Sequence, residues 1–93
     1  MKELPPPPVL YHGTAEKYLD GIKKEGLLKR SRNYVYLSAD YDTAVKVGAR
    51  HGKPIVLKID ADKMFNDGFV FLLSANGVWQ TDHVPYAYVT QLQ

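Results

Sequence analysis

The stretch LYHGT at residues 10–14 closes an apolar run with an aromatic ring, an imidazole, a glycine and a hydroxyl group. Three clusters of a similar kind follow it in order: VYLS at 35–38, RHGKP at 50–54 and NGVW at 76–79. Each one joins polar or aromatic groups to the end of an apolar segment, which is where domains of mixed strands and helices tend to build sites. The order and spacing of these clusters are the most informative feature of the sequence.

Length and composition indicate one small domain. The chain has 93 residues, of which 45% are apolar and 24% charged, as in ordinary soluble globular proteins. It contains no cysteine, so it has neither a disulfide framework nor a cysteine-based metal site. It also lacks the run of ~18 apolar residues that a membrane span needs and has no signal-peptide pattern. We therefore expect a cytoplasmic protein with no membrane partner.

Positive charge is concentrated in the middle of the chain, although the net charge is only +2. Residues 23–58 hold nine Lys or Arg and three acids, a net of +6, whereas the rest holds three bases and seven acids, a net of −4. This uneven field favours an anionic partner such as a nucleotide or nucleic acid, although a solvated basic face has the same composition. The nine basic residues are Lys23, Lys24, Lys29, Arg30, Arg32, Lys46, Arg50, Lys53 and Lys58.

The apolar pattern predicts an α+β domain with a mostly antiparallel sheet, because strands outnumber helices and the late strands follow one another directly. Thr14 is expected to cap a first helix, which carries an apolar stripe of Ala15, Tyr18, Leu19 and Ile22 and ends at Gly26. A hairpin turn is expected at Asn76-Gly77. The predicted strands are 9–12, 34–38, 55–60, 69–73, 78–81 and 86–89, the second helix is 40–50, a short helical turn is 61–66, and 27–33 is a basic loop or short strand.

The N-terminal segment differs in composition from the rest. Pro5 to Pro8 form a polyproline II stretch with no core of its own. Residues 1–8 are therefore interpreted as a Pro-rich leader or the remnant of a linker, and residues 9–93 as the folded domain.

Several side chains have both a structural and a functional interpretation. His12 is either a strand-end histidine bonded to a backbone carbonyl or a hydrogen-bonding partner for a ribose hydroxyl, with Gly13 allowing close approach of a ligand. Tyr36 and Ser38 share a strand face, which suits core packing or a platform for a planar heterocycle. Arg50 either binds helix-end carbonyls or offers a rigid fork to a phosphate.

The basic loop and the remaining aromatic and histidine residues are less decisive. Lys29, Arg30 and Arg32 are suited to holding a pyrophosphate, but they are equally typical of a solvated loop. The single tryptophan, Trp79, more often belongs to a core than to a ligand site. The three histidines lack zinc-site spacing and accompanying carboxylates, so we expect no metal.

The ordered clusters resemble the NAD-binding lobe of the RNA 2'-phosphotransferases, the tRNA-splicing branch of the ADP-ribosyltransferase superfamily. The resemblance covers nearly all of residues 9–89. It implies an ADP-ribosyltransferase-like split antiparallel sheet with two main helices. It also implies NAD as co-substrate, without a metal, and RNA bearing a 2'-phosphate as acceptor. The matched pieces are residues 10–14, 26–27, 31–32, 37–40, 47–48, 50–54, 76–79 and 84–85.

The resemblance implies roles for individual residues. His12 is expected to contact a ribose hydroxyl, and the Gly13 backbone to hold the nicotinamide amide. Tyr36 and Ser38 are expected to line the nicotinamide pocket, and Arg50 to face the substrate phosphate. Thr14 and Arg32 complete the expected NAD-binding set.

Val78 falls at the third position of the superfamily triad, where poly-ADP-ribosylating relatives carry glutamate. A valine accepts no proton, so the nucleophile should already be ionised at neutral pH, as a phosphate is. The family usually has histidine where this chain has Tyr36, which moves the triad toward the His–Tyr pattern. Gln80 occupies a position that is usually apolar.

The family also carries an N-terminal RNA-binding lobe with an Arg-His pair and a further Arg. Together with Arg50 these residues form the expected catalytic quartet, and Arg50 is the member found in this sequence. Either that lobe is absent or a partner completes the site. Three other functions are consistent with the sequence. They are an ADP-ribosylating toxin or effector with another acceptor, a non-catalytic NAD or ADP-ribose binding module, and a structural RNA-binding domain.

Overall fold

Strands outnumber helices in the computed structural model of the protein, which describes residues 2–92. The helices are α1 (Leu19–Glu25), α2 (Tyr41–Ala49) and α3 (Ala61–Asn66), with short 3-10 turns η1 (Glu16–Tyr18) and η2 (Tyr86–Tyr88). The strands are β1 (Lys2–Glu3), β2 (Val9–Ala15), β3 (Leu27–Leu28), β4 (Val35–Leu37), β5 (Pro54–Asp60), β6 (Leu72–Leu73), β7 (Trp79–Thr81), β8 (His83–Val84) and β9 (Val89–Leu92).

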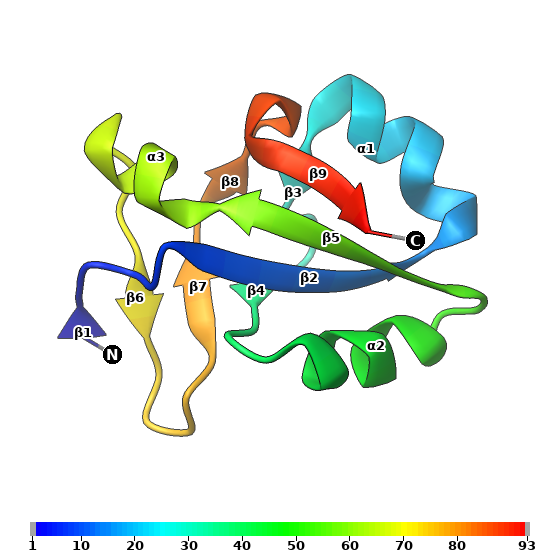
Figure 1. Cartoon of the computed structure of the whole chain (residues 1–93), viewed down its shortest axis with the longest axis horizontal. Coiled ribbons are helices and arrows are strands. Elements are labelled where there is room, and N and C mark those ends of the chain that lie inside the picture. The colour runs from blue at the N-terminus through cyan, green and yellow to red at the C-terminus, as the bar shows by residue number, and fades with distance from the viewer. Residues whose placement is uncertain (1, 93) are drawn as a thin grey trace.

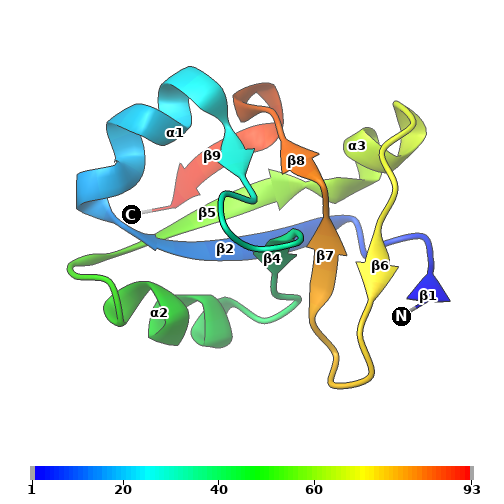
Figure 2. The same cartoon turned by 180° about the vertical axis from the view of Figure 1, so that it is seen from behind.

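The strands form three antiparallel groups, in the orders β1-β6-β7-β4, β2-β5-β9 and β3-β8. The predicted α+β class with antiparallel sheets is therefore confirmed. The long strands β2 and β5 run across the molecule, and β6 and β7 cross them in both views (Figures 1 and 2). The finer ADP-ribosyltransferase-like arrangement stays a prediction.

The core lies where the two larger sheets face each other. Alternation along β4 buries Val35 and Leu37 and exposes Tyr36, as the period-2 pattern predicts. On β5, Leu57 and Ile59 are fully buried. The core cluster consists of Leu10, Ile22, Leu27, Val35, Leu37, Ile55, Leu57, Ile59, Ala61, Met64, Phe71, Trp79 and Val84. Trp79 is 8% exposed, which agrees with its interpretation as a core residue.

Helix α2 packs closely on β2 through two glycines. A Cβ atom added to Gly13 would overlap the carbonyl oxygen of Ala44 and lie 2.8 Å from the amide nitrogen of Gly48. A Cβ atom added to Gly48 would lie 2.6 Å from the carbonyl oxygen of Thr14. The helix runs alongside β2 in Figures 1 and 2, so the glycine of the LYHGT stretch is needed first for this helix–strand contact.

Local signals correctly predicted several boundaries. Gly26 follows α1 with a φ of 76°, a backbone conformation that favours glycine. Asp40 caps α2, since its carboxylate accepts a 2.9 Å hydrogen bond from the amide of Thr43. Gly77 has a φ of 84° in the turn between β6 and β7, which confirms the hairpin at Asn76-Gly77.

The start of the first helix was predicted wrongly. Thr14 does not cap a helix but lies buried within β2, which continues to Ala15 because its ladder with β5 extends that far. The predicted apolar stripe is also only partly formed. Ile22 is buried and Leu19 packs against the core, but Tyr18 is 48% exposed because it belongs to η1, which has a different twist from α1.

Two late strands also differ from the prediction. Strand β6 contains only Leu72 and Leu73 of the predicted 69–73, because the amide of Phe69 is still bonded to Met64 at the end of α3. The predicted strand at 86–89 begins as the 3-10 turn η2 and becomes β9 only at Val89. Pro85, with its φ of −60°, starts this turn, and its carbonyl accepts a 3.1 Å bond from the amide of Tyr88.

The N-terminal segment makes contacts that the sequence did not predict. Lys2 and Glu3 form β1, which pairs with Leu73 and Leu72 at the edge of the β6-β7-β4 sheet. The amide of Leu4 also donates to the carbonyl of Phe71 at 3.1 Å. The division into a leader at 1–8 and a domain at 9–93 stays a prediction.

Replacing Gly13 by alanine should destabilise the fold by about 3 kcal/mol or more, because the added methyl meets the backbone of α2 and cannot be accommodated by a side-chain movement. The matched control is Gly21→Ala in α1, where an added Cβ meets nothing within 4 Å. This control should be neutral or stabilising by up to about 1 kcal/mol, since alanine favours helix. Urea unfolding of both variants measures the difference; equal stabilities would contradict the close contact.

Candidate functional site

Strands β2 and β4 touch at one point and then separate. The amide of Tyr11 donates to the carbonyl of Ser38 at 2.7 Å, and the amide of Ser38 donates to the carbonyl of Tyr11 at 2.8 Å. If the same register continued, Gly13 would lie opposite Tyr36. Instead the two strands diverge, and the Nδ1 atom of His12 lies 2.9 Å from the carbonyl oxygen of Tyr36. The His12 ring therefore spans a split between the two larger sheets.

This contact defines the protonation of His12. A carbonyl oxygen only accepts hydrogen bonds, so Nδ1 carries the proton and, in the neutral ring, Nε2 is left as an acceptor. Burial lowers the pKa of His12 below its ordinary value of 6.5; the bond to the Tyr36 carbonyl opposes this shift, and the nearby His51 adds to it. At neutral pH the site therefore presents an uncharged imidazole with an acceptor nitrogen.

The Gly13 backbone also faces the split. Hydrogen-bonding directions alternate along an antiparallel strand, and Tyr11 directs its amide and carbonyl toward Ser38. Gly13, two residues further, directs its own amide and carbonyl to the same side, away from its β5 neighbour Val56. The carbonyl of Tyr36 is already bonded to His12. The split thus presents a donor and an acceptor from the Gly13 backbone.

Tyr36 and Arg32 lie together beside the split. Tyr36 is 38% exposed, and the guanidinium carbon of Arg32 lies 5.1 Å from the centre of its ring. The neighbouring Lys29 instead pairs with Asp82, with its Nζ atom 2.7 Å from the carboxylate. Of the cations in the basic loop, Arg32 therefore lies next to the predicted site, whereas Lys29 is held by an acid.

Ser38 has a structural role at the entry to α2. Its hydroxyl donates to the carbonyl of Asp40 and accepts from the amide of Asp40, both at 3.0 Å. Hydrogen bonds from the Thr43 hydroxyl and amide lower the pKa of Asp40, which keeps this cap ionised. The hydroxyl of Ser38 therefore takes part in a turn, and its contact with a cofactor stays a prediction.

Val78 lies next to this turn. Strand β7 pairs Trp79 with Leu37 and Gln80 with Tyr36, so continuing the register by one residue places Val78 opposite Ser38. Its amide donates to the hydroxyl of Ser74 at 3.0 Å, and its side chain is partly buried. The three triad positions predicted from sequence thus lie on, or directly beside, neighbouring strands. The polar side chain paired with Tyr36 is that of Gln80, which is only 9% exposed.

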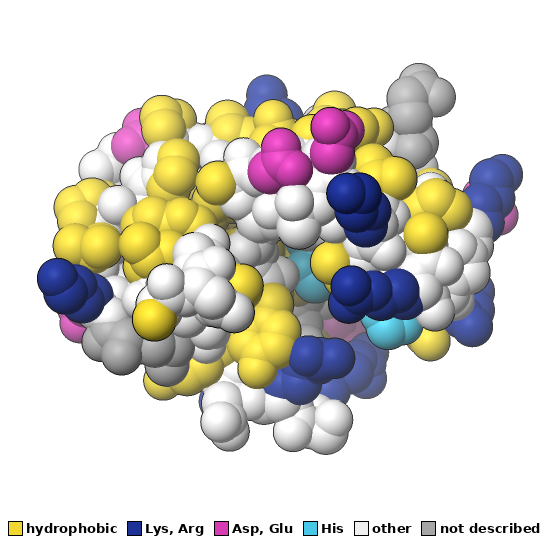
Figure 3. Space-filling model, turned by 90° about the horizontal axis from the view of Figure 1, so that it is seen from below, with side chains coloured by type: hydrophobic (Ala, Val, Ile, Leu, Met, Phe, Trp, Pro, Cys, Tyr) yellow, Lys and Arg dark blue, Asp and Glu magenta, His cyan; other side chains and the backbone are white. Residues whose placement is uncertain are grey.

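Arg50 and Thr14 are placed differently from the residues at the split. Arg50 is exposed at the end of α2, and among residues 2–92 its side chain has no ion-pair partner. Thr14 is 6% exposed, so little of its side chain is available to a ligand. Viewed from below, Lys and Arg side chains cluster around histidine side chains on the half of the molecule formed by α2 (Figure 3). The predicted roles of both residues stay predictions.

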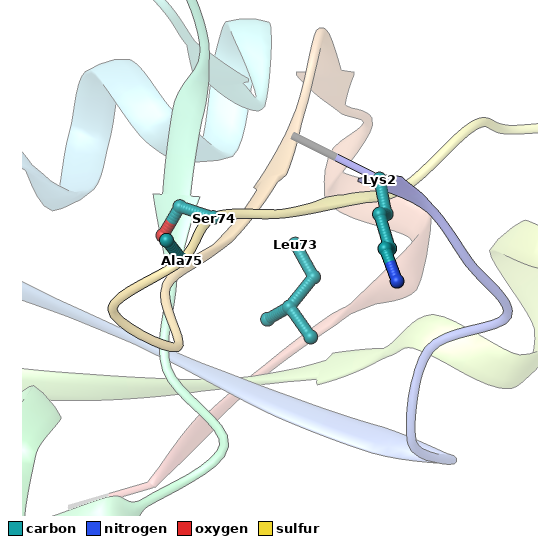
Figure 4. A pocket seen from close by; sticks show the side chains of 4 residues that line it. All are labelled: Lys2, Leu73, Ser74 and Ala75. Atoms are coloured by element: carbon teal, nitrogen blue, oxygen red, sulfur yellow. The ribbon is translucent and has the colours of Figure 1, made fainter.

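Two surface hollows lie elsewhere. One, of about 320 Å³, is lined by Lys2, Leu73, Ser74 and Ala75 (Figure 4). A second, of about 280 Å³, is lined by Pro8, Val9, Lys58, Asp60, Asp62 and Thr90. Neither includes His12 or Tyr36. Tyr18 and Tyr41 are exposed tyrosines that were not predicted as site residues. Tyr41 begins α2, and Tyr18 lies against His51 beyond the end of α2. Their exposure follows from packing and has no clear signal in the sequence.

Two further properties hold for the part of the chain that the structure describes. Residues 2–92 contain no group of three or more His, Cys, Asp or Glu side chains arranged to hold a metal ion. None of the helices in the same range has the length and apolar character required to cross a membrane.

Comparisons with known proteins agree with the resemblance. Residues 1–83 match the family described as RNA 2'-phosphotransferase, Tpt1 / KptA family. A "Probable RNA 2'-phosphotransferase" of Acaryochloris marina is 54% identical over 90 residues, which are 97% of this chain and 50% of the relative. Proteins of the same name from Agrobacterium fabrum and Streptomyces coelicolor are 56% and 55% identical, over 91% and 90% of this chain and 46% of each relative.

The chain belongs to the RNA 2'-phosphotransferase, Tpt1 / KptA family, because the family match covers most of its length. The chain spans about half the length of the curated relatives it matches.

Acidification should weaken the fold through His12. Its folded-state pKa lies below the unfolded value of 6.5, so the unfolded chain binds more protons between these two values. The free energy of unfolding should therefore fall as the pH is lowered from about 7.5 toward about 5. Urea unfolding across this range should show a smaller loss for His12→Gln than for the wild type. Tyr36→Phe is the control and should keep the wild-type loss, because the acceptor is a backbone carbonyl. Equal losses in wild type and His12→Gln would contradict the assignment.

Proposed function

We propose that this chain is the NAD-binding part of an ADP-ribosyltransferase of the RNA 2'-phosphotransferase type, acting on RNA that bears a 2'-phosphate. The observation that carries it is the split between β2 and β4. There, a neutral His12 with a free Nε2 acceptor lies beside an unpaired backbone edge at Gly13.

The residues at the split fit a nicotinamide riboside. The carboxamide of nicotinamide has a carbonyl acceptor and an NH2 donor group, and Gly13 presents the complementary donor and acceptor. The Nε2 atom of His12 is an acceptor for a ribose hydroxyl. Tyr36 supplies a half-exposed ring at the position that would lie opposite Gly13.

Cationic side chains near the split suit the charged parts of the substrates. Arg32 lies over the Tyr36 ring, where its guanidinium can approach a pyrophosphate. Arg50 is exposed at the end of α2 and is available to the RNA phosphate. These contacts would bring the phosphate oxygen and the nicotinamide-bearing ribose carbon together and would offset the charge between two anionic substrates.

Val78 favours a phosphate as the nucleophile. When bound, NAD would supply the ADP-ribosyl group, with nicotinamide as the leaving group that takes the electron pair of the broken C–N bond. An ionised phosphate oxygen needs no general base, and a valine beside Ser38 provides none. The residues of this chain would therefore act by binding and orienting, with His12 holding a ribose hydroxyl and Arg50 the attacking phosphate.

The remaining half of the relatives' length is proposed to contribute to the RNA side of the site. The chain described here matches about half of each relative.

Nicotinamide release from NAD tests this function, with and without an oligonucleotide carrying an internal 2'-phosphate. Release should require the phosphorylated RNA. His12→Ala and Arg50→Ala should each lower the rate by roughly 100-fold, as expected for removing one group that stabilises a transition state. Lys63→Ala is the matched control, because this lysine pairs with Asp67 on α3 and lies outside the site.

The other outcomes distinguish the competing functions. Release without RNA would indicate a glycohydrolase or an effector with a different acceptor. NAD binding without release, in the presence of phosphorylated RNA, would contradict catalysis by this chain and indicate a binding module. RNA binding that ignores NAD and falls steeply with salt would indicate a structural RNA-binding domain.

A further inference from the structure

Tyr18 and His51 form a pair of exposed aromatic rings where η1 meets the end of α2. Their ring centres lie 6.4 Å apart and their planes meet at 72°, an edge-to-face arrangement. Tyr18 is 48% exposed, and His51 is exposed as well. Neither ring belongs to the hydrophobic core or to the split between β2 and β4, so neither is explained by folding or by NAD binding.

The backbone holds this aromatic pair in place. The amide of Glu16 donates to the carbonyl of Lys53 at 3.0 Å, and the two side chains form an ion pair at 3.4 Å. The amide of His51 donates to the carbonyl of Gly48 at 3.0 Å, in the same part of α2 that packs on β2. The backbone segments that carry the two rings are therefore fixed before any ligand binds, which lowers the entropy cost of binding.

Cations surround the pair. The Nζ atom of Lys17 lies 5.3 Å from the centre of the Tyr18 ring, and Arg50 directly precedes His51. Among residues 2–92 neither cation is in an ion pair. Several Lys and Arg side chains lie on this half of the molecule in Figure 3, with other side chains between them. Flat exposed rings next to unpaired cations are the combination that binds single-stranded nucleic acid, because bases stack on the rings and phosphates meet the cations.

We infer that Tyr18, packed edge-to-face against His51, stacks an unpaired nucleobase of the RNA acceptor, next to the phosphate that Arg50 receives. The inference rests on the proposed function, since it takes RNA as the acceptor. His51 follows Gly48 by less than one helical turn, and Gly48 packs on the Thr14 backbone, so the pair lies beside the strand that carries His12. A base stacked there belongs to a nucleotide flanking the 2'-phosphate, and its identity matters little, because every base has a stacking face.

Binding of a single-stranded oligoribonucleotide with one internal 2'-phosphate tests the inference. Fluorescence anisotropy should show that Tyr18→Ala raises the Kd by roughly 5- to 100-fold, whereas Tyr18→Phe keeps the wild-type value. The matched control is Tyr41→Ala, which removes a tyrosine of similar exposure, 41%, at the other end of α2. A 2-aminopurine placed beside the 2'-phosphate should be quenched by the wild type and not by Tyr18→Ala.

Salt dependence separates stacking from charge. Tyr18→Ala should weaken binding equally at all salt concentrations, because a stacked ring releases no counterions. Arg50→Ala should instead reduce the slope of log K against log salt by about one. A Tyr18→Ala variant with the wild-type thermal midpoint and an unchanged Kd for RNA would overturn the inference and leave the proposed function intact.

Two other results would also overturn it. If Tyr18→Ala lowered the affinity for NAD alone and not for RNA, the rings would serve the dinucleotide. If the wild-type chain bound the phosphorylated and unmodified oligonucleotides equally weakly, both this inference and RNA as the acceptor would fail.

Discussion

The hydrogen bond between His12 and the Tyr36 carbonyl replaces a bond of the β-ladder, and the site depends on this replacement. Strands β2 and β4 are joined at Tyr11 and Ser38, and one step further the imidazole crosses the gap that the diverging strands leave. The bond orients the ring, places the proton on Nδ1 and presents Nε2 as an acceptor. It also leaves the amide and carbonyl of Gly13 without a partner on the β4 side. One side chain thus holds the sheets in their split arrangement and creates the polar groups at the split.

The close contact between α2 and β2 gives this arrangement its rigidity. Gly13 and Gly48 let the helix backbone approach the strand backbone, so the strand that carries His12 is fixed on the side opposite to the imidazole. The same helix begins at the Ser38–Asp40 turn and ends at Arg50 and His51. It therefore connects the junction of the sheets with the exposed aromatic pair. The glycine of the LYHGT stretch serves packing on one side and, as proposed, ligand recognition on the other.

Acidic and basic side chains have different roles around these elements. Acids are used locally, as Asp40 caps α2, Asp82 holds Lys29 and Glu16 holds Lys53. Arg32, Lys17 and Arg50 remain available near aromatic rings. Exposed ion pairs contribute little to stability, so the paired acids matter mainly because they determine which cations are left for an anionic ligand.

The sequence by itself determined the features that depend on neighbouring residues. Period-2 burial in β4, the start of α2 near Asp40, the Gly26 helix end and the Asn76-Gly77 turn follow from short-range geometry, and the ordered clusters identified the family. Only the tertiary structure decided what depends on distant segments. Thr14 continued β2 because β5 paired with it, and Tyr18 became exposed where the first turn is 3-10. The split, the free edge of Gly13 and the pairing of Tyr18 with His51 each require two segments that are far apart in the chain, so no local pattern encodes them.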